Sequence, residues 1–466
     1  MKKILLIIVA VALMAVDMVS AQSRTSYFME GSYFRTELNP ALVPTRGYLA
    51  LPAMSGVGLN LSTNFLSVDN FIYQNGDEYV TALHGSVSPD DFLGNIPNVS
   101  KMALDMRLNI LGVGFYKNRT FWSFGFEVRG SQSMALSKDL FTVLKTLGNG
   151  TYELGNTALS ADVHLDAYLG ASFPVCDWAS VGVKAKFLVG LMNVGAQFDS
   201  LYANVGEDSI TGTLRGHWRA NGVVTENARI NADGSYTMPA DIISTALNNV
   251  KSFGAAIDLG AEFRLIDDHL RISAAITDLG FIKWAPETHI GGELAGDFYF
   301  NGFDIESGKA DADANFDNGV LGLDSYPGYT TMLNYSVNVG VEYNILNNHI
   351  AFGVLSHTKF CNTMTYSELT ASVNFRATNW LTATVSHTFL GGNKPGIFGA
   401  AINIHPAAIN IYLGVDFIDT HYVKVTDIDA LPSGSIYIPH YASSLNAYFG
   451  FGFNFGRPKF LKYNAK

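Results

Sequence analysis

Charged residues and cysteines are both scarce in this chain. Asp, Glu, Lys and Arg make up 15% of its 466 residues, against roughly 25% in soluble domains. Cys176 and Cys361 are the only cysteines, and so low a number excludes a disulfide-stapled secreted scaffold. We expect these two at opposite ends of the fold and not bonded to each other. The net charge of −11 argues against a nucleic-acid partner.

Long apolar runs are missing beyond the N-terminus. Met1-Lys2-Lys3 precedes an apolar run that ends at Val16, and Ala21 closes a small-x-small cleavage site. These features predict a signal peptide over residues 1–21. No later segment approaches the ~20 consecutive apolar residues of a transmembrane helix. We therefore expect an exported protein that does not cross a membrane with helices.

Signatures of catalysis are also missing. The chain contains no Gly-x-Ser-x-Gly, no His-Glu-x-x-His and no cysteine-rich zinc spacing. His357 and His387 each follow a serine directly, and neighbouring residues of a strand face opposite sides. We therefore expect neither an enzyme nor a cofactor.

The chain is rich in strict alternation of apolar and polar residues. Between Phe253 and Leu265 every second residue is apolar, while Asp258, Glu262 and Arg264 lie on the other phase. A period of two predicts a strand with one apolar and one polar face. Many such segments are longer than the ~5–6 residues usual in soluble proteins and match the ~9–11 that cross a bilayer on a tilt. Fourteen segments are predicted to be strands: 56–64, 105–117, 120–130, 159–173, 179–196, 253–265, 270–278, 331–344, 349–357, 364–376, 380–389, 396–404, 407–417 and 444–456.

Short and long connections alternate between these segments. Outer-membrane barrels have short periplasmic turns and long outer loops. We therefore predict an all-β fold, a transmembrane antiparallel β-barrel of about 14 strands over residues 56–466. It would lie in the outer membrane of a Gram-negative bacterium, surrounded by lipid, with both termini in the periplasm. The alternative is a soluble secreted β-protein. Residues 139–147 and 240–250 predict short helices in the long loops, and residues 208–219 predict an extra strand above the membrane.

Residues 22–55 precede the first predicted strand and do not alternate. Pro40 and Pro44 deny this backbone regular ladder bonding. Asn39 precedes a proline, which favours an extended or turn conformation, and its side chain can bond nearby backbone. A segment of this kind can fold back into the lumen as a plug. Arg35, Glu37 and Arg46 could then pair with lumenal carboxylates.

The triplet Asn39-Pro40-Ala41 carries a family resemblance. Its place in a pre-barrel segment, ahead of about 14 strands, resembles the FadL family of hydrophobic-compound transporters. Leu38 to Gly47 is also similar to a Leu-Asn-Pro-Ala-x-x-Pro-x-Arg-Gly signature of other FadL-like outer-membrane proteins. The resemblance implies a hatch over residues 22–55 and a lateral gap at a strand kink. Arg35, Asn39, Pro40, Ala41 and Arg46 are the candidate hatch residues, and they would either gate the lumen or only hold the plug in place.

The polar phase of the strands predicts a charged lumen. Carboxylates and cations are mixed there, so a porin with a field of one sign is not expected. The set could be an internal ion-pair network, or it could contact protons or an anionic substrate. The candidate lumenal residues are Asp162, His164, Asp166, Lys184, Lys186, Asp258, Glu262 and Arg264.

One loop has the spacing of a calcium site. Asp313, Asn315, Asp317 and Asp324 occupy positions 1, 3, 5 and 12 of a twelve-residue stretch, which is the spacing of oxygen ligands in calcium loops. Position 6 is Asn318 rather than glycine. A structural Ca²⁺ and a solvated acidic loop are the two interpretations.

These features together predict passive uptake of a small hydrophobic compound through a plugged lumen. The alternative is a non-transporting FadL-like barrel that docks or anchors exported proteins. The expected partners are accordingly outer-membrane lipid, a hydrophobic small molecule or a protein.

Overall fold

The computed structural model describes fourteen stretches of the chain. They are residues 24–50, 57–76, 78–146, 150–206, 210–222, 229–230, 236–237, 250–304, 309–316, 327–390, 396–418, 422–426, 435–439 and 444–456. The predicted signal peptide lies outside them.

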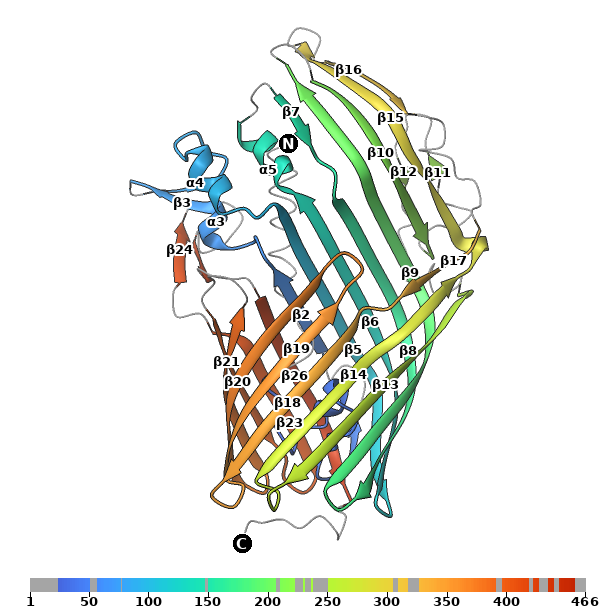
Figure 1. Ribbon diagram of the computed structural model, residues 1–466, viewed down its shortest axis with the longest axis vertical. Coiled ribbons are helices and arrows are strands. Elements are labelled where there is room, and N and C mark those ends of the chain that lie inside the picture. Colours follow the sequence, from blue (N-terminus) through green and yellow to red (C-terminus); the bar gives the residue numbers. More distant parts are fainter. Residues whose placement is uncertain are drawn as a thin grey trace.

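These residues form a closed antiparallel β-barrel of 14 strands (Figure 1). Each strand pairs with its sequence neighbours, and β26 closes the barrel by pairing with β1 and β2. The strands in order are β1 (Gly47–Ala50) with β2 (Val57–Thr63), β5 (Val99–Lys117), β6 (Thr120–Ser137), β8 (Thr157–Cys176), β9 (Ala179–Val205), β13 (Ser252–Leu265), β14 (Leu270–Trp284), β17 (Tyr329–Met332) with β18 (Tyr335–Ile345), β19 (Ile350–Phe360), β20 (Thr365–Thr378), β21 (Leu381–Leu390), β22 (Ile397–Ile404), β23 (Ile409–Ile418) and β26 (Ser444–Phe455).

Every predicted strand corresponds to one of these, so the predicted fold is confirmed. The boundary of the plug needs a correction. It was placed at residue 55, but Gly47–Ala50 already pairs with both β5 and β26, and the barrel therefore begins at Gly47. A run of four residues is too short to show a period of two, which is why the sequence did not reveal β1.

The two ends of the barrel differ. One end carries short turns, such as Asn118, whose φ of 56° allows a tight reversal between β5 and β6. At the other end β9, β10, β15 and β16 rise as a sheet above the barrel (Figure 1). The predicted extra strand at 208–219 is β10. The strands outside the barrel wall are β3 (Ile72–Asn75), β4 (Glu78–Thr81), β7 (Gly150–Glu153), β10 (Ile210–Asn221), β11 (Arg229–Ile230), β12 (Tyr236–Thr237), β15 (His289–Asp304), β16 (Lys309–Phe316), β24 (Tyr422–Thr426) and β25 (Ser435–Pro439).

Short helices account for little of the structure. They are α2 (Arg35–Leu38), α3 (Val68–Phe71), α4 (Pro89–Gly94), α5 (Lys138–Thr146) and η2 (Pro286–Thr288). The helix predicted at 139–147 is α5, and it packs Phe141 into a small apolar cluster with Phe65 and Phe92 at the long-loop end. Residues 240–249 of the second predicted helix lie outside the described residues. None of the described helices has the length and the apolar character needed to cross a membrane.

The outward face of the barrel is apolar. On β6 the side chains of Trp122, Phe124 and Phe126 are exposed, while those of Ser123 and Glu127, on the other phase, are buried inside. The same alternation holds on β13, where Phe253, Leu259 and Phe263 are exposed. Exposed aromatic and aliphatic side chains on strands of this length form a surface that lipid can cover. The protein is therefore a membrane-spanning barrel.

Candidate functional site

The lumen is occupied by residues 24–46, here called the N-terminal segment. Most of its side chains are buried, and they contact inward-facing residues all around the wall. Thr25 bonds Ser386 on β21 at 2.6 Å between hydroxyl oxygens. The carbonyl of Leu38 accepts a hydrogen bond of 2.8 Å from Asn338 on β18. The segment thus spans the inside of the barrel from one wall to another.

Asn39 fixes the turn at the centre of the segment. It is fully buried, and its Oδ1 accepts a hydrogen bond of 2.9 Å from the Ala41 amide, which is the local bond that the sequence suggested. Its Nδ2 donates to the Tyr27 hydroxyl at 3.2 Å. It also donates to the backbone of the wall at Ala261. One side chain therefore shapes the turn and attaches it to the barrel.

Two glycines make room for this turn. Gly182 on β9 and Gly260 on β13 lie directly opposite each other in the sheet. A methyl group at Gly182 would overlap the Pro40 carbonyl, and one at Gly260 would overlap Asn39 Oδ1. We call Gly182 and Gly260 the glycine notch. The Asn39-Pro40-Ala41 turn lies against the barrel backbone at these two glycines.

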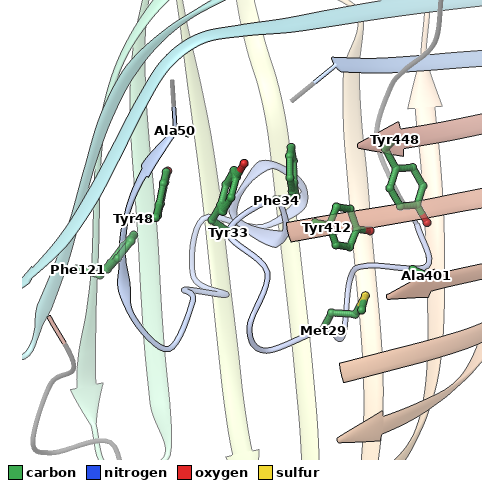
Figure 2. Packing of buried hydrophobic residues seen from close by; sticks show 9 residues of the cluster. All are labelled: Met29, Tyr33, Phe34, Tyr48, Ala50, Phe121, Ala401, Tyr412 and Tyr448. Atoms are coloured by element: carbon green, nitrogen blue, oxygen red, sulfur yellow. The ribbon is translucent and has the colours of Figure 1, made fainter. Parts of the chain in front are cut away.

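Aromatic stacking holds another part of the segment. Tyr33 stacks on Tyr48 of β1 with ring centroids 4.5 Å apart, and Phe34 lies 5.1 Å from the ring of Tyr412 on β23. Figure 2 shows these rings in a row between the segment and the wall, ending at Phe121. Stacked pairs of this kind contribute about 0.5–1.5 kcal/mol each beyond their buried area.

Four ion pairs among the described residues attach the segment to the wall. Arg24 contacts Glu368 at 2.6 Å, Glu37 pairs with Arg107, and Glu30 pairs with Arg271 and, at 3.8 Å, with Arg376. Burial alone would raise the pKa of Glu30, but the charges of Arg376, Arg271 and Arg35 hold it well below its usual range. Glu30 is therefore a carboxylate at neutral pH.

The candidate hatch residues are placed differently from one another. Asn39, Pro40 and Ala41 form the turn in the glycine notch. Arg46 donates a hydrogen bond of 3.3 Å to the carbonyl of Ala407 in a short turn. The expected pairing of Arg35 with a lumenal carboxylate is wrong within the described residues, where its guanidinium has no ion pair although it is only 4% exposed. Carboxylates near it are engaged by other arginines, since Glu30 pairs with Arg271 and Glu342 with Arg376, which a period of two cannot reveal.

Seven of the eight candidate lumenal residues are buried inside the barrel, and Arg264, which is partly exposed, lines a cavity inside its short-turn end. They interact as neighbours: His164 lies 3.3 Å from both Asp162 and Asp166, and Lys186 lies 2.8 Å from Asp258. Lys184 is 4.0 Å from Asp258 and donates a hydrogen bond to the carbonyl of Thr36 in the segment. Glu262 and Arg264, 3.8 Å apart, lie nearer the short turns. The set is a network of ion pairs across the lumen. Its members nearer the short turns lie against the N-terminal segment.

Asp278 is a central member of this network that the sequence did not identify as lumenal. It pairs with Arg129 at 2.6 Å and also with Lys186. The register of β13 and β14 shifts here, so that Thr277 and Asp278 together face Asp258. Such a β-bulge turns one extra side chain inward. Counting alternate residues along a regular strand does not assign Asp278 to the lumen. The only indication in the sequence was that this polar residue directly precedes Leu279.

The same bulge brings apolar side chains inward beyond it. Ile282 and Trp284 are fully buried and pack with Leu188 and Leu333 in an apolar cluster inside the wall. The pairing of β14 passes from β18 to β17 between Thr277 and Phe281, so the ladder is interrupted beside this cluster. A change from charged to apolar lining thus coincides with a break in the strand pairing.

The calcium hypothesis falls partly outside the described residues. Asp317 and Asp324 lie outside them. Asp313 and Asn315 lie on β16, an extended strand paired with β15, rather than in the tight loop that the ligand spacing suggested. The calcium site stays a prediction.

This geometry defines the class of protein. It is a membrane-spanning β-barrel whose lumen is filled by its own N-terminal segment and by a layer of ion pairs. Residues 40–416 match the family described as "Family of unknown function (DUF5723)", and the chain belongs to that family. No curated protein matches the chain.

Several solved barrels resemble it in structure at low sequence identity. The toluene transporter TbuX of Ralstonia pickettii is 10% identical, with 94% of this chain and 95% of that chain covered and a TM-score of 0.37. The monoaromatic hydrocarbon channel CymD is 8% identical, with 93% and 94% covered and a TM-score of 0.36. A FadL homologue of Pseudomonas aeruginosa is 10% identical, with 94% and 99% covered and a TM-score of 0.35. The family that the Asn39-Pro40-Ala41 triplet resembles is thus among these neighbours.

Proposed function

We propose that this barrel takes up small hydrophobic compounds across the outer membrane of a Gram-negative bacterium, and that the N-terminal segment acts as a movable hatch. The long loops would face outward, and the short turns and both termini would face the periplasm. The compound would cross passively, driven by its own concentration gradient.

The attachment of the segment is the observation that carries this proposal. In the described part of the chain, the backbone–backbone hydrogen bonds of residues 24–46 are all local, and the first one to the wall is donated by Gly47. Side chains make the remaining attachments. The segment can therefore shift without breaking any ladder bond of the barrel, whereas removal of a wall strand would open the sheet.

The lining of the lumen supports a hydrophobic rather than a polar cargo. The apolar cluster of Ile282, Trp284 and Leu333 lies beside the interrupted pairing of β14. A buried apolar surface attracts a hydrophobic compound with about 25 cal/mol per Å². The ion-pair layer next to it offers no such gain. We therefore propose that the compound enters along the apolar cluster and leaves sideways or past the displaced segment.

A reversible lock on the segment tests the hatch. Thr25 and Ser386 are buried with hydroxyl oxygens 2.6 Å apart, so cysteines at these two positions would bring their sulfur atoms together, and we expect a disulfide between them on oxidation. The double variant, Thr25→Cys with Ser386→Cys, is made with Cys176→Ser and Cys361→Ser so that no other disulfide forms. We expect uptake of radiolabelled toluene into cells to fall when the lock is oxidised and to return on reduction.

Each single-cysteine variant serves as the matched control, because it carries the same loss of the hydroxyl contact without the cross-link. Uptake in the controls should not respond to oxidation. Equal toluene uptake by the oxidised and the reduced double variant, with the disulfide verified by mass spectrometry, would show that the segment does not need to move.

Docking of an exported protein is the second candidate function. The sheet above the barrel supports it, because β16 pairs only with β15 among the described strands. An edge strand of this kind can pair with another chain. The discriminating experiment is purification from the native membrane. A stoichiometric protein partner together with toluene uptake that is independent of this barrel would favour docking over uptake.

A further inference from the structure

A cavity lies between the N-terminal segment and the short turns. Its volume is about 480 Å³, and it is separate from the apolar cluster at the other end of the lumen. Arg119 and Asp177 of the short turns form part of its lining, and their side chains are 65% and 94% exposed. The cavity is therefore accessible from the end of the barrel that carries these turns.

Arg35 of the segment lies on the wall of this cavity. It is only 4% exposed, and its Nε has no acceptor. Within the described residues the guanidinium forms neither an ion pair nor a hydrogen bond. A buried charge without a partner costs several kcal/mol, so this position is unusual for a residue that only fills space.

The other arginines around the cavity are all paired. Arg264 donates a hydrogen bond of 2.8 Å to Ser180, Arg119 is 3.5 Å from Asp177, Arg271 pairs with Glu30, and Arg376 pairs with Glu342. Arg35 alone among them has no such partner in the described chain. Burial lowers the pKa of Arg35, and the attraction of Glu262, Glu30 and Glu342 does not fully offset it.

We propose that this cavity binds a small organic monoanion whose carboxylate pairs with the Arg35 guanidinium. The planar fork of an arginine matches a carboxylate with two parallel hydrogen bonds. One negative charge balances one unpaired cation, whereas a dianion would also be repelled by Glu30 and Glu262, which line the same cavity. Leu42 and Phe121 on its wall offer apolar surface to the rest of the ligand.

The size of the cavity selects a small molecule over an acidic protein segment. Its volume falls within the roughly 300–1,000 Å³ of small-molecule sites. The proposal does not depend on uptake, because the site can be filled from the short-turn end while the segment stays in place. The two ideas can therefore fail separately.

Benzoate and its uncharged analogue benzamide test the site. The full-length protein in detergent is titrated with each compound while its melting temperature is followed. We expect benzoate to raise the melting temperature in a saturable way and benzamide to have no effect. The variant Arg35→Met should lose the benzoate response and, without benzoate, should melt at the same temperature as the native protein or higher, because an unpaired buried charge has been removed.

Arg264→Met is the matched control, because it removes an arginine from the same cavity that already has partners. It should keep the benzoate response and lower the melting temperature. An equal response to benzamide, or an Arg35→Met variant that still responds to benzoate, would overturn the proposal. The benzoate and benzamide comparison on the native protein stands even where a variant fails to fold.

Discussion

The glycine notch offers the sharpest test of how the N-terminal segment is held. Replacing Gly182 or Gly260 with alanine places a methyl group against the backbone of Pro40 or the side chain of Asn39. The contacted atoms belong to a tight turn, so they cannot give way as the end of a flexible side chain could. Overpacking of this kind costs about 1–3 kcal/mol. Because the barrel ladder is intact in the variant, the cost falls on the seated segment.

This cost translates into a measurable rate. A free-energy change of about 1–3 kcal/mol raises the population of displaced segment by about 5- to 150-fold, since 1.4 kcal/mol is a factor of ten. Ser32 of the segment is fully buried, so Ser32→Cys in a background without Cys176 and Cys361 reports on exposure. Labelling by a membrane-impermeant maleimide follows the displaced population when reseating is fast. We expect the cysteine of Ser32→Cys to be labelled about 5- to 150-fold faster when Gly182→Ala or Gly260→Ala is added.

Gly130→Ala on β6 is the control. The added methyl group there would lie 3.2 Å from the flexible end of Met106, far from the segment, and labelling of Ser32→Cys should not change. The two notch glycines are neighbours, so their effects need not add. If both notch variants remain folded barrels and label at the native rate, the turn is not seated against these glycines and the reasoning fails.

Three further predictions concern pH and metal. Glu30→Gln should accelerate Ser32→Cys labelling at pH 7, because Arg271 loses its nearer carboxylate and keeps only that of Glu342 at 3.8 Å, which costs up to about 3 kcal/mol; an unchanged rate would contradict this. The pKa of Glu30 is lowered in the folded state, so its stabilisation is present above the unfolded pKa of about 4.3 and is lost as the pH falls below that value. His405 acts at higher pH: burial, followed by the charge of Arg46, lowers its pKa to about 4, so its stabilisation is present above about pH 6.5 and is lost as the pH falls towards 4. That loss is up to about 3 kcal/mol. Because maleimide reacts with the thiolate, whose fraction itself falls with pH, the labelling rate is divided by that of an exposed cysteine at the same pH. His405→Asn should remove the pH dependence of this ratio between pH 7 and 5, whereas an unaltered profile would refute this role. Millimolar Ca²⁺ should raise the melting temperature of the native protein but not of Asp313→Ala, and the absence of a shift in the native protein would end the calcium hypothesis.

The regular parts of the fold could be predicted because a bilayer imposes a strict alternation on a barrel strand. Trp122, Phe124 and Phe126 had to face lipid, and this alone assigned Glu127 to the lumen. The eight charged lumenal residues were found in the same way, since each keeps the alternation of its own strand, even where the register with a neighbouring strand shifts at His164 and Asp258. The prediction failed where regularity stops. Asp278 sits on a bulge, and Gly47–Ala50 is too short a strand for its period to be recognised.

The segment inside the barrel shows the same limit more clearly. The sequence indicated a turn at Asn39 and Pro40, because proline restricts its neighbour and asparagine bonds local backbone. It could not indicate that Gly182 and Gly260 would meet opposite each other beneath that turn, since strand register depends on the closure of the whole barrel. Nor could it indicate that Arg35 would be left without a carboxylate.

The sequence by itself determined which residues face lipid and which face the lumen, because side chains on a strand alternate with a period of two whatever the rest of the chain does. The tertiary structure decided which lumenal residues are partners and which cation is left unpaired. Those outcomes depend on register, on a single bulge and on the path of a segment with no period of its own. Local alternation therefore determines which face of the sheet a residue occupies, whereas its neighbours inside the lumen are determined only when the barrel closes.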